Sequence, residues 1–458
     1  MISPLTAEQI IALAPDPGSV KSGRELATPR KWPTLGRRAS KSVVWGECQG
    51  SGSSPYRTQI DLTEPAFRCT CPSRKFPCKH GIGLFLLLAD KPGLFIEAAA
   101  PAWVVDWLDT RAQRAHKTKQ APSDKAPGKE QQGTAAPESR PTTQEPKQNR
   151  RSEQREKRVR LGLRELETWL DDLARNGLAS AQTQPFTYWE RTAARLVDAQ
   201  APGAARLVKE MAAIAQSGDG WAERMLAAVG RLHLLLEGYR RIDSLPPQTQ
   251  ADIRTLLGWT LNQEELLAEA GVRDRWVVLG QRVEDEDRLK VKRTWLWGEE
   301  SGQWALVLHF AHGKDPLDVS LAPGTIIEAT LVFYEGSGPK RALVKDKHGP
   351  PEPLGAMPGK GLLAAIEAYS RAQTANPWLE RFPFSLAEVI PVRQDVGNSR
   401  SGWAVRDAQG YTLPLASHPD GWWPLLALSG GRPISIFGEW NGVYLLPLSA
   451  WSGTFVQF

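Results

Sequence analysis

Three of the four cysteines in this chain lie within ten residues of one another, and a histidine follows two residues after the third. The set is Cys69, Cys71, Cys78 and His80, in the order C-x-C-x6-C-x-H. Thiolates and imidazole are the ligands that tetrahedral zinc prefers, and a closed shell of three Cys and one His leaves no position for a substrate water. The four residues therefore predict one structural Zn²⁺.

Two other interpretations of the cysteines are weaker. Four cysteines in 458 residues are too few for a disulfide-built scaffold, and a Cys69–Cys71 bridge would be strained. A catalytic thiol would need a base, and the sequence assigns none. Cys48 lies outside the motif, and we expect a buried small apolar residue at that position.

Length and composition indicate a folded, multidomain chain. At roughly 100–200 residues per domain, 458 residues form about two to four units. A composition of 41% hydrophobic and 24% charged residues excludes disorder throughout. The longest apolar run, residues 82–89, is far shorter than the ~20 residues of a membrane span. The start lacks signal-peptide features, so we expect a cytoplasmic protein without membrane contact.

The positive charge is concentrated in the first third of the chain. Residues 1–110 hold 13 Lys+Arg and 10 Asp+Glu, residues 111–160 hold 14 and 6, and residues 161–458 hold 30 and 35. The pI of about 9.1 therefore does not make the whole chain a nucleic-acid binder.

Hydrophobic periodicity and turn residues predict an α+β fold with four regions. Alternating side chains at 42–48 and 56–62 predict a β-hairpin before the cysteines, and the apolar stretch 81–90 predicts a buried helix after them. A region rich in Ala, Leu, Glu and Arg predicts four to six helices in a bundle, and the short apolar runs after residue 276 predict strands, with a helix at 361–372. The expected units are residues 1–110 with a finger core at about 40–90, a disordered basic linker at 111–160, a helical region at 161–270 and a β-rich domain at 271–458.

The pattern C-x-C-x(n)-C-x-H between a hairpin and an apolar helix resembles the SWIM zinc finger. The resemblance covers about residues 40–90. It implies a small β-β-α zinc module used for DNA or protein contacts, with Cys69, Cys71, Cys78 and His80 as ligands. Bacterial relatives of this layout also imply a protein partner, such as an AAA+ ATPase or a von Willebrand A-domain protein.

Cationic side chains surround the predicted ligands. Arg68, Arg74, Lys75 and Lys79 are candidates for phosphate contacts, and the basic stretch 21–41 lies upstream. The alternative is that these cations offset the net negative charge of the zinc site. The helix after His80 is too apolar to read bases in a groove, so sequence-specific recognition is not expected.

Enzyme signatures are absent from the sequence. It contains no phosphate-binding loop, dinucleotide fingerprint, nucleophile elbow or His-Glu-x-x-His motif. We interpret the acidic run 284–287 as a solvated turn rather than a cation site, and His309 and His312 as strand-end residues. Most of the 18 tryptophans are expected in cores, although Trp422, Trp423 and Trp440 could line a groove.

The leading hypothesis is a non-enzymatic zinc-binding adaptor that contacts protein, nucleic acid or both. The first alternative is a DNA- or RNA-binding accessory factor in which the finger and residues 111–160 hold the phosphate backbone. The second is an enzyme with an unrecognised site in the C-terminal region.

Overall fold

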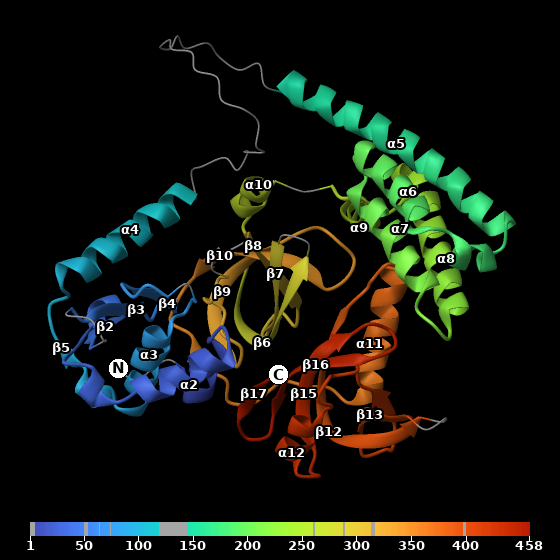
Figure 1. Cartoon of the computed structure of the whole chain (residues 1–458). Helices are drawn as coiled ribbons and strands as arrows, with labels where there is room; N and C mark the ends of the chain where they lie inside the picture. The colour runs from blue at the N-terminus through green and yellow to red at the C-terminus, as the bar shows by residue number, and fades with distance from the viewer. Residues whose placement is uncertain are drawn as a thin grey trace, which may run out of the picture.

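The protein is α+β, with three sheets and one helical region among the residues that the structure describes (Figure 1). This computed structural model describes residues 5–49, 54–63, 65–73, 75–118, 145–259, 262–286, 289–312, 317–396 and 400–458. Short 3₁₀ helices occur at Pro29–Lys31, Ala39–Lys41, Pro92–Leu94, Leu178–Thr183 and Ile242–Ser244.

The N-terminal unit is a five-stranded sheet flanked by helices. Its strands have the order β4-β3-β2-β1-β5, with β1 and β5 parallel and the other neighbours antiparallel. The predicted hairpin is the β2–β3 pair, and the predicted apolar helix is α3. The elements are α1 (Ala7–Ala12), α2 (Pro17–Leu26), β1 (Thr34–Arg38), β2 (Val43–Cys48), β3 (Tyr56–Asp61), β4 (Ala66–Cys69), α3 (Lys79–Asp90), β5 (Ile96–Glu97) and α4 (Ala102–Thr118).

Helix α3 forms the centre of this unit because it is apolar on every side. Ile82, Leu84, Phe85 and Leu87 have no exposed surface, and they pack with residues from α1 and from the sheet. A helix that is hydrophobic all round has to be buried. The apolar surface of α3 makes the helix unsuitable for reading bases in a nucleic-acid groove. The same apolar surface makes α3 the core of the N-terminal unit.

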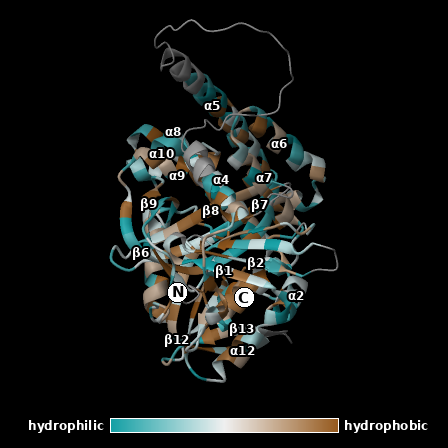
Figure 2. Cartoon of the chain, turned by 90° about the vertical axis from the view of Figure 1, so that its left-hand side faces the viewer, coloured by the Kyte–Doolittle hydropathy of each residue, from teal (hydrophilic) through white to brown (hydrophobic). Residues whose placement is uncertain are grey.

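The helical region packs around a regular apolar stripe on α5. Val159, Leu163, Leu166, Leu170 and Leu173 are all buried, and their spacing of four, three, four and three residues places them on one face of the helix. Outside this stripe α5 is largely hydrophilic (Figure 2). The helices are α5 (Glu145–Arg175), α6 (Phe186–Asp198), α7 (Pro202–Ala215), α8 (Trp221–Arg240), α9 (Pro247–Leu257) and α10 (Gln263–Ala268).

The prediction of a disordered linker over 111–160 is wrong at both ends. Helix α4 continues to Thr118, and α5 begins at Glu145. The stripe on α5 starts inside the predicted linker, and tertiary contacts hold this part of the helix, since the hydroxyl of Tyr239 donates to Glu156 at 2.6 Å. Composition alone misses such a helix because its stability depends on the neighbours that cover its apolar face. The rest of the predicted linker, 119–144, lies outside the described residues.

The first half of the C-terminal region is a closed barrel. Strand β6 pairs with β7, β7 with β8, β8 with β10, β10 with β9, and β9 again with β6; the β8–β10 pair is parallel and the others are antiparallel. The interior contains Trp276, Val278, Leu296 and Leu331. The strands are β6 (Val272–Glu286), β7 (Leu289–Gly298), β8 (Trp304–His312), β9 (Thr325–Phe333) and β10 (Lys340–Lys347), with the short β11 (Glu352–Pro353) beside β9.

The second half repeats this order of pairing. Strand β12 pairs with β13, β13 with β14, β15 with β12 and β16 with β15, and a parallel bridge from Leu415 to Leu445 joins the end of β14 to β16. In each half the first strand is 15 residues long, contains a register shift and is shared by two partners. The elements are α11 (Leu362–Ala375), β12 (Phe382–Val396), β13 (Arg400–Arg406), β14 (Thr412–Pro414), α12 (Trp423–Ser429), β15 (Ile434–Trp440), β16 (Leu445–Trp451) and β17 (Phe455–Gln457). The sequence shows no repeat, so this internal similarity is visible only in the topology.

The β-rich region contacts both other parts of the chain. The amide of Gln9 on α1 donates to the carbonyl of Gly324 beside the first barrel, and Ala322 joins the apolar cluster of the N-terminal unit. The indole of Trp378 donates to the carbonyl of Arg231 on α8 at 3.0 Å. Both the zinc-ligand unit and the helical region are therefore packed against the β-rich region.

A buried carboxylate links the two barrels. Glu439 on β15 is 4% exposed and accepts from Arg293 at 3.1 Å, from the indole of Trp295 at 2.7 Å and from Arg381 at 3.2 Å. Burial raises the pKa of Glu439, but the two arginines and the indole outweigh burial and hold this pKa below its ordinary value. The stabilisation is therefore present above the ordinary pKa of glutamate and is lost as the pH falls through the lower value of the folded protein.

No described helix is both long enough and apolar enough to cross a membrane.

We expect Glu439→Ala to destabilise the C-terminal region by about 3–5 kcal/mol, because it leaves the largely buried guanidinium of Arg293 without its carboxylate and removes one of the two carboxylates that pair with Arg381. Calorimetric thermal unfolding would show this as a midpoint lowered by several degrees. The matched control is Glu352→Ala, since Glu352 pairs with Arg275 at 3.1 Å but its side chain is 60% exposed, and we expect less than about 1 kcal/mol there. Equal shifts for the two variants would contradict this role of Glu439.

Candidate metal centre

Four side chains from the β4–α3 segment meet at the edge of the N-terminal unit. Cys69 is the last residue of β4, Cys71 lies in the turn that follows, Cys78 is the residue that caps α3, and His80 is in the first turn of that helix. The pairing of Cys69 with Thr58 on β3 fixes the first ligand to the sheet, and the start of α3 fixes the last two. Two rigid elements thus hold the ends of a short loop.

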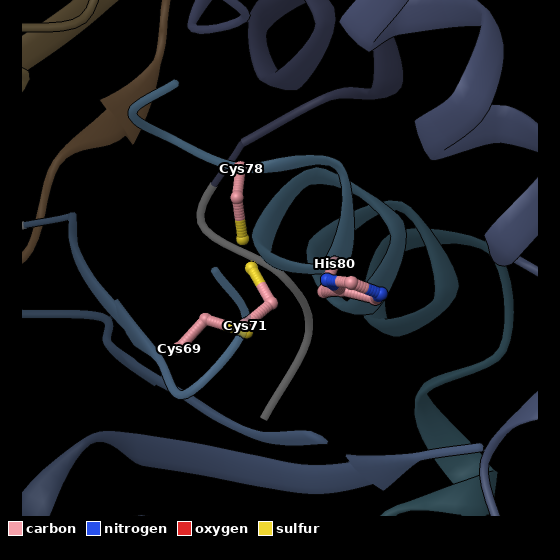
Figure 3. Close-up of side chains that lie close together, drawn as sticks. All are labelled: Cys69, Cys71, Cys78 and His80. Atoms are coloured by element: carbon pink, nitrogen blue, oxygen red, sulfur yellow. The ribbon is translucent and has the colours of Figure 1, made fainter. Parts of the chain in front are cut away.

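The ligand atoms of these four residues all lie within 4.8 Å of one another, which is close enough for one ion. Figure 3 shows the cysteine side chains converging, with His80 beside them on α3. Cys78 and His80 are 7% and 4% exposed, and the buried Nδ1 of His80 has no hydrogen-bond partner in the described structure. Three thiols, an imidazole and a buried nitrogen without a protein partner fit a tetrahedral zinc ion.

Hydrogen bonds favour negative charge on the sulfur of Cys69. The Cys78 thiol donates to Cys69, and this bond, with further bonds from His80, Thr58 and the backbone N–H of Cys71, outweighs burial and lowers the pKa of Cys69 to about 4. The pKa of Cys78 is raised, first by that same bond to Cys69 and then by burial. Backbone N–H groups of Ser73 and Gly81 favour the thiolates of Cys71 and Cys78, but burial of Cys71 and the bond from Cys78 to Cys69 outweigh them, so both pKa values are raised. Zinc ligation requires thiolates, so binding of the ion releases these protons.

Aromatic rings pack beside the ligand-bearing segments. The ring of Tyr56 lies over His80 with centroids 4.9 Å apart, and Phe67 contacts both Phe76 and Phe85 edge-on. The hydroxyl of Thr58 lies 3.2 Å from the sulfur of Cys69. The module holds one structural Zn²⁺ through Cys69, Cys71, Cys78 and His80, and when bound the ion supplies folding energy rather than a reactive position.

Cys48 does not belong to this cluster. It has no exposed surface, and burial, its largest influence, raises the pKa of its thiol to about 11. A buried thiol of this kind is a small apolar side chain that packs in the core, as the sequence predicts.

A cleft of about 830 Å³ opens beside the zinc ligands. Three exposed cations line it, namely Arg30, Lys31 and Lys79, and no carboxylate is among its lining residues in the described structure. None of the three forms an ion pair with a described residue. The other lining residues are Leu26, Gln49, Tyr56, Cys71, Pro72, Ser73 and His80.

The structure separates the four predicted cationic contacts. Lys79 lines the cleft, whereas Lys75 forms an ion pair with Asp16 at 2.9 Å. Arg68 is exposed on β4 outside the cleft, and Arg74 lies outside the described residues. The sequence indicated Arg30 and Lys31 only as part of the basic stretch 21–41. Their position beside the zinc ligands depends on the tertiary fold, so local sequence patterns could not predict it.

The other candidate residues have structural surroundings. Glu284 pairs with Arg381 at 2.9 Å, and Nδ1 of His309 accepts from the N–H of Asp318 at 3.3 Å. In the described part of the chain, the Cys69–His80 set is the only group of three or more residues found that could hold a metal ion. Trp422 and Trp440 are buried in the second barrel, and Trp423 is 52% exposed.

A Cys₃His site set between a β-hairpin and an apolar helix defines a structural zinc-finger protein. The family model described as SWIM zinc finger matches residues 56–89, and the model described as SWIM-associated four-helix bundle domain matches residues 154–257. The chain therefore contains a SWIM zinc finger and a SWIM-associated four-helix bundle domain. No curated protein and no solved structure is significantly similar to it. The second match covers the helical region, which the sequence alone did not connect to the finger.

Metal analysis of the purified protein should give close to one zinc per chain. Cys78→Ser removes a thiolate ligand and should lose most of this zinc. The matched control is Cys48→Ala, which removes a buried thiol outside the cluster and should retain zinc. A Cys78→Ser protein with full zinc content would contradict the ligand assignment.

Proposed function

We propose that the protein is a non-enzymatic accessory factor that binds nucleic acid through the cationic cleft beside its zinc site. The observation that carries the proposal is the lining of this cleft, where Arg30, Lys31 and Lys79 are exposed and have no carboxylate partner among the described residues. Phosphate groups are the ligands that such a set of cations attracts. The zinc ion keeps Lys79, at the start of α3, in place relative to the other two cations.

The closed zinc shell supports a non-enzymatic role. Four protein ligands leave no position at which the metal could activate water. The cleft itself offers phosphate contacts but no recognition helix, because the exposed part of α3 near it is limited to Lys79. Binding without base readout is therefore the form of recognition that the cleft supports.

A second candidate function is a protein adaptor, favoured by an apolar groove in the helical region. The groove has a volume of about 360 Å³ and lies between α7 and α8, with Trp378 and Val443 at its rim. Leu207, Met211 and Ile214 line it. A hydrophobic segment of a partner protein, such as an AAA+ ATPase or a von Willebrand A-domain protein, is the occupant that this groove would suit.

Titration of the full chain with labelled duplex DNA at two salt concentrations tests the first proposal. We expect micromolar binding at low salt, and a log–log salt slope of about −3 if the three cations each neutralise one phosphate. Replacing Arg30, Lys31 and Lys79 together by Gln should weaken binding at least about tenfold. The control is Lys91→Gln, a change of an exposed lysine at the far end of α3.

Two outcomes would contradict the cleft as the binding site. One is an unchanged affinity of the triple variant while its zinc content stays at one per chain. The other is an absence of binding by the wild-type chain at low salt, which would leave the protein-adaptor candidate in its place.

A further inference from the structure

Arginines and aromatic rings alternate on the side of the first barrel that faces the helical region. The guanidinium of Arg341 on β10 lies 5.6 Å from the ring centre of Phe310 and 4.7 Å from that of Tyr334. Across from them, the guanidinium of Arg155 on α5 lies 4.6 Å from the ring of Trp259. These five residues form what we call the arginine–aromatic groove.

A cavity connects the two halves of this groove. It has a volume of about 260 Å³, slightly below the ~300–1,000 Å³ of typical small-ligand pockets, and Trp259, Tyr334 and Arg341 all line it. The connection between β9 and β10 forms one wall. Asp252 on α9 holds this connection in place, because its carboxylate accepts the backbone N–H of Ser337 at 3.1 Å.

The strands beneath the groove are strongly cationic, although residues 161–458 as a whole carry more acids than bases. The adjacent strands β7, β8 and β10 contain seven Lys+Arg and a single acid, Asp346. Several of these cations are engaged internally: Lys292 with the carbonyl of Asp318, Arg293 with Glu439, Lys345 with the carbonyl of Glu269, and Lys290 with Asp285. Lys340 and Arg341 line the cavity together with two acidic residues, Asp252 and Glu335, of which Asp252 accepts from the backbone of Ser337.

The groove contains an exposed aromatic ring and arginine side chains without a carboxylate partner among the described residues, which are features that suit an anionic, aromatic ligand. Phe310 is 42% exposed, which is unusual for a phenylalanine on a barrel strand. Arg341 forms no ion pair with any described residue, and the buried Nε atoms of Arg341 and Arg155 have no hydrogen-bond partner in the described parts of the chain. Stacking on rings rather than pairing with carboxylates therefore positions both guanidinium groups, and Arg155 in addition donates from Nη2 to the carbonyl of Gly258 at 2.9 Å.

We infer that the arginine–aromatic groove binds single-stranded nucleic acid. Unpaired bases stack on Phe310 and Tyr334, and the phosphates between them meet Arg341 and Lys340. A duplex cannot bind in this way because its base faces are already stacked. Closed five-stranded barrels bind oligonucleotides through strand faces and connecting loops in other proteins, but here the inference rests on the side chains, since a fold alone does not define a function. The site is separate from the cleft beside the zinc ion.

The test is a fluorescence titration of the full chain with a labelled oligothymidine of roughly 16 nucleotides. We expect Phe310→Ala with Arg341→Gln to weaken binding about tenfold or more, because each base–aromatic stack contributes substantially to affinity. Phe310→Trp keeps a stacking surface and should bind at least as tightly as the wild type. The matched control is Phe186→Ala with Arg432→Gln, which removes an exposed phenylalanine and an exposed arginine elsewhere.

The outcomes distinguish this site from the zinc-side cleft. If Phe310→Ala with Arg341→Gln weakens oligothymidine binding and leaves duplex binding unchanged, single strands bind at the arginine–aromatic groove. This conclusion holds even if the triple Gln variant of the zinc-side cleft has no effect. Unchanged oligothymidine binding by the Phe310 and Arg341 variant overturns the inference, whatever the cleft variant does. Competition by oligoglutamate as effective as that by unlabelled oligothymidine would also overturn it, because charge alone would then explain the binding.

Discussion

Coordination of one zinc ion by Cys69, Cys71, Cys78 and His80 is the interaction on which the N-terminal unit depends. The loop between Cys71 and Cys78 is rich in polar residues and proline, and it buries little apolar surface of its own. Zinc-finger peptides gain about 10–16 kcal/mol of apparent binding energy from the metal, and this energy appears as folding energy. The ion thus joins β4 to the start of α3, and α3 in turn forms the centre of the apolar core.

The position of the zinc site determines what the neighbouring cations can do. Because α3 begins at the metal ligands, Lys79 is held beside Arg30 and Lys31 from a distant part of the sequence. Packing of α1 against the first barrel then fixes this cationic cleft relative to the β-rich region. A cationic cleft and a separate arginine–aromatic groove on one chain would let the proposed nucleic-acid binding involve two stretches of nucleic acid, or a duplex and a single strand.

Much of this organisation could be predicted from local sequence patterns. The ligand set followed from spacing alone, and the hairpin, α3 and α11 followed from alternation, apolar runs and turn residues. The extent of α5 did not, because Val159 and Glu156 become informative only when their partners in the helical region are known. The closure of the two barrels could not be predicted from the sequence either, because the parallel pairs β8–β10 and Leu415–Leu445 join residues far apart in the chain. The groove depends on the same long-range placement, which brings Trp259 and Arg155 opposite Tyr334 and Arg341.

The central claim is that the zinc ion organises a nucleic-acid-binding cleft, and the most direct measurement compares duplex DNA binding by the full chain before and after the zinc is removed with a chelator. The account predicts that salt-sensitive binding at the cleft is lost with the metal and returns when one equivalent of zinc is restored. Duplex binding that persists unchanged in the zinc-free protein would contradict it.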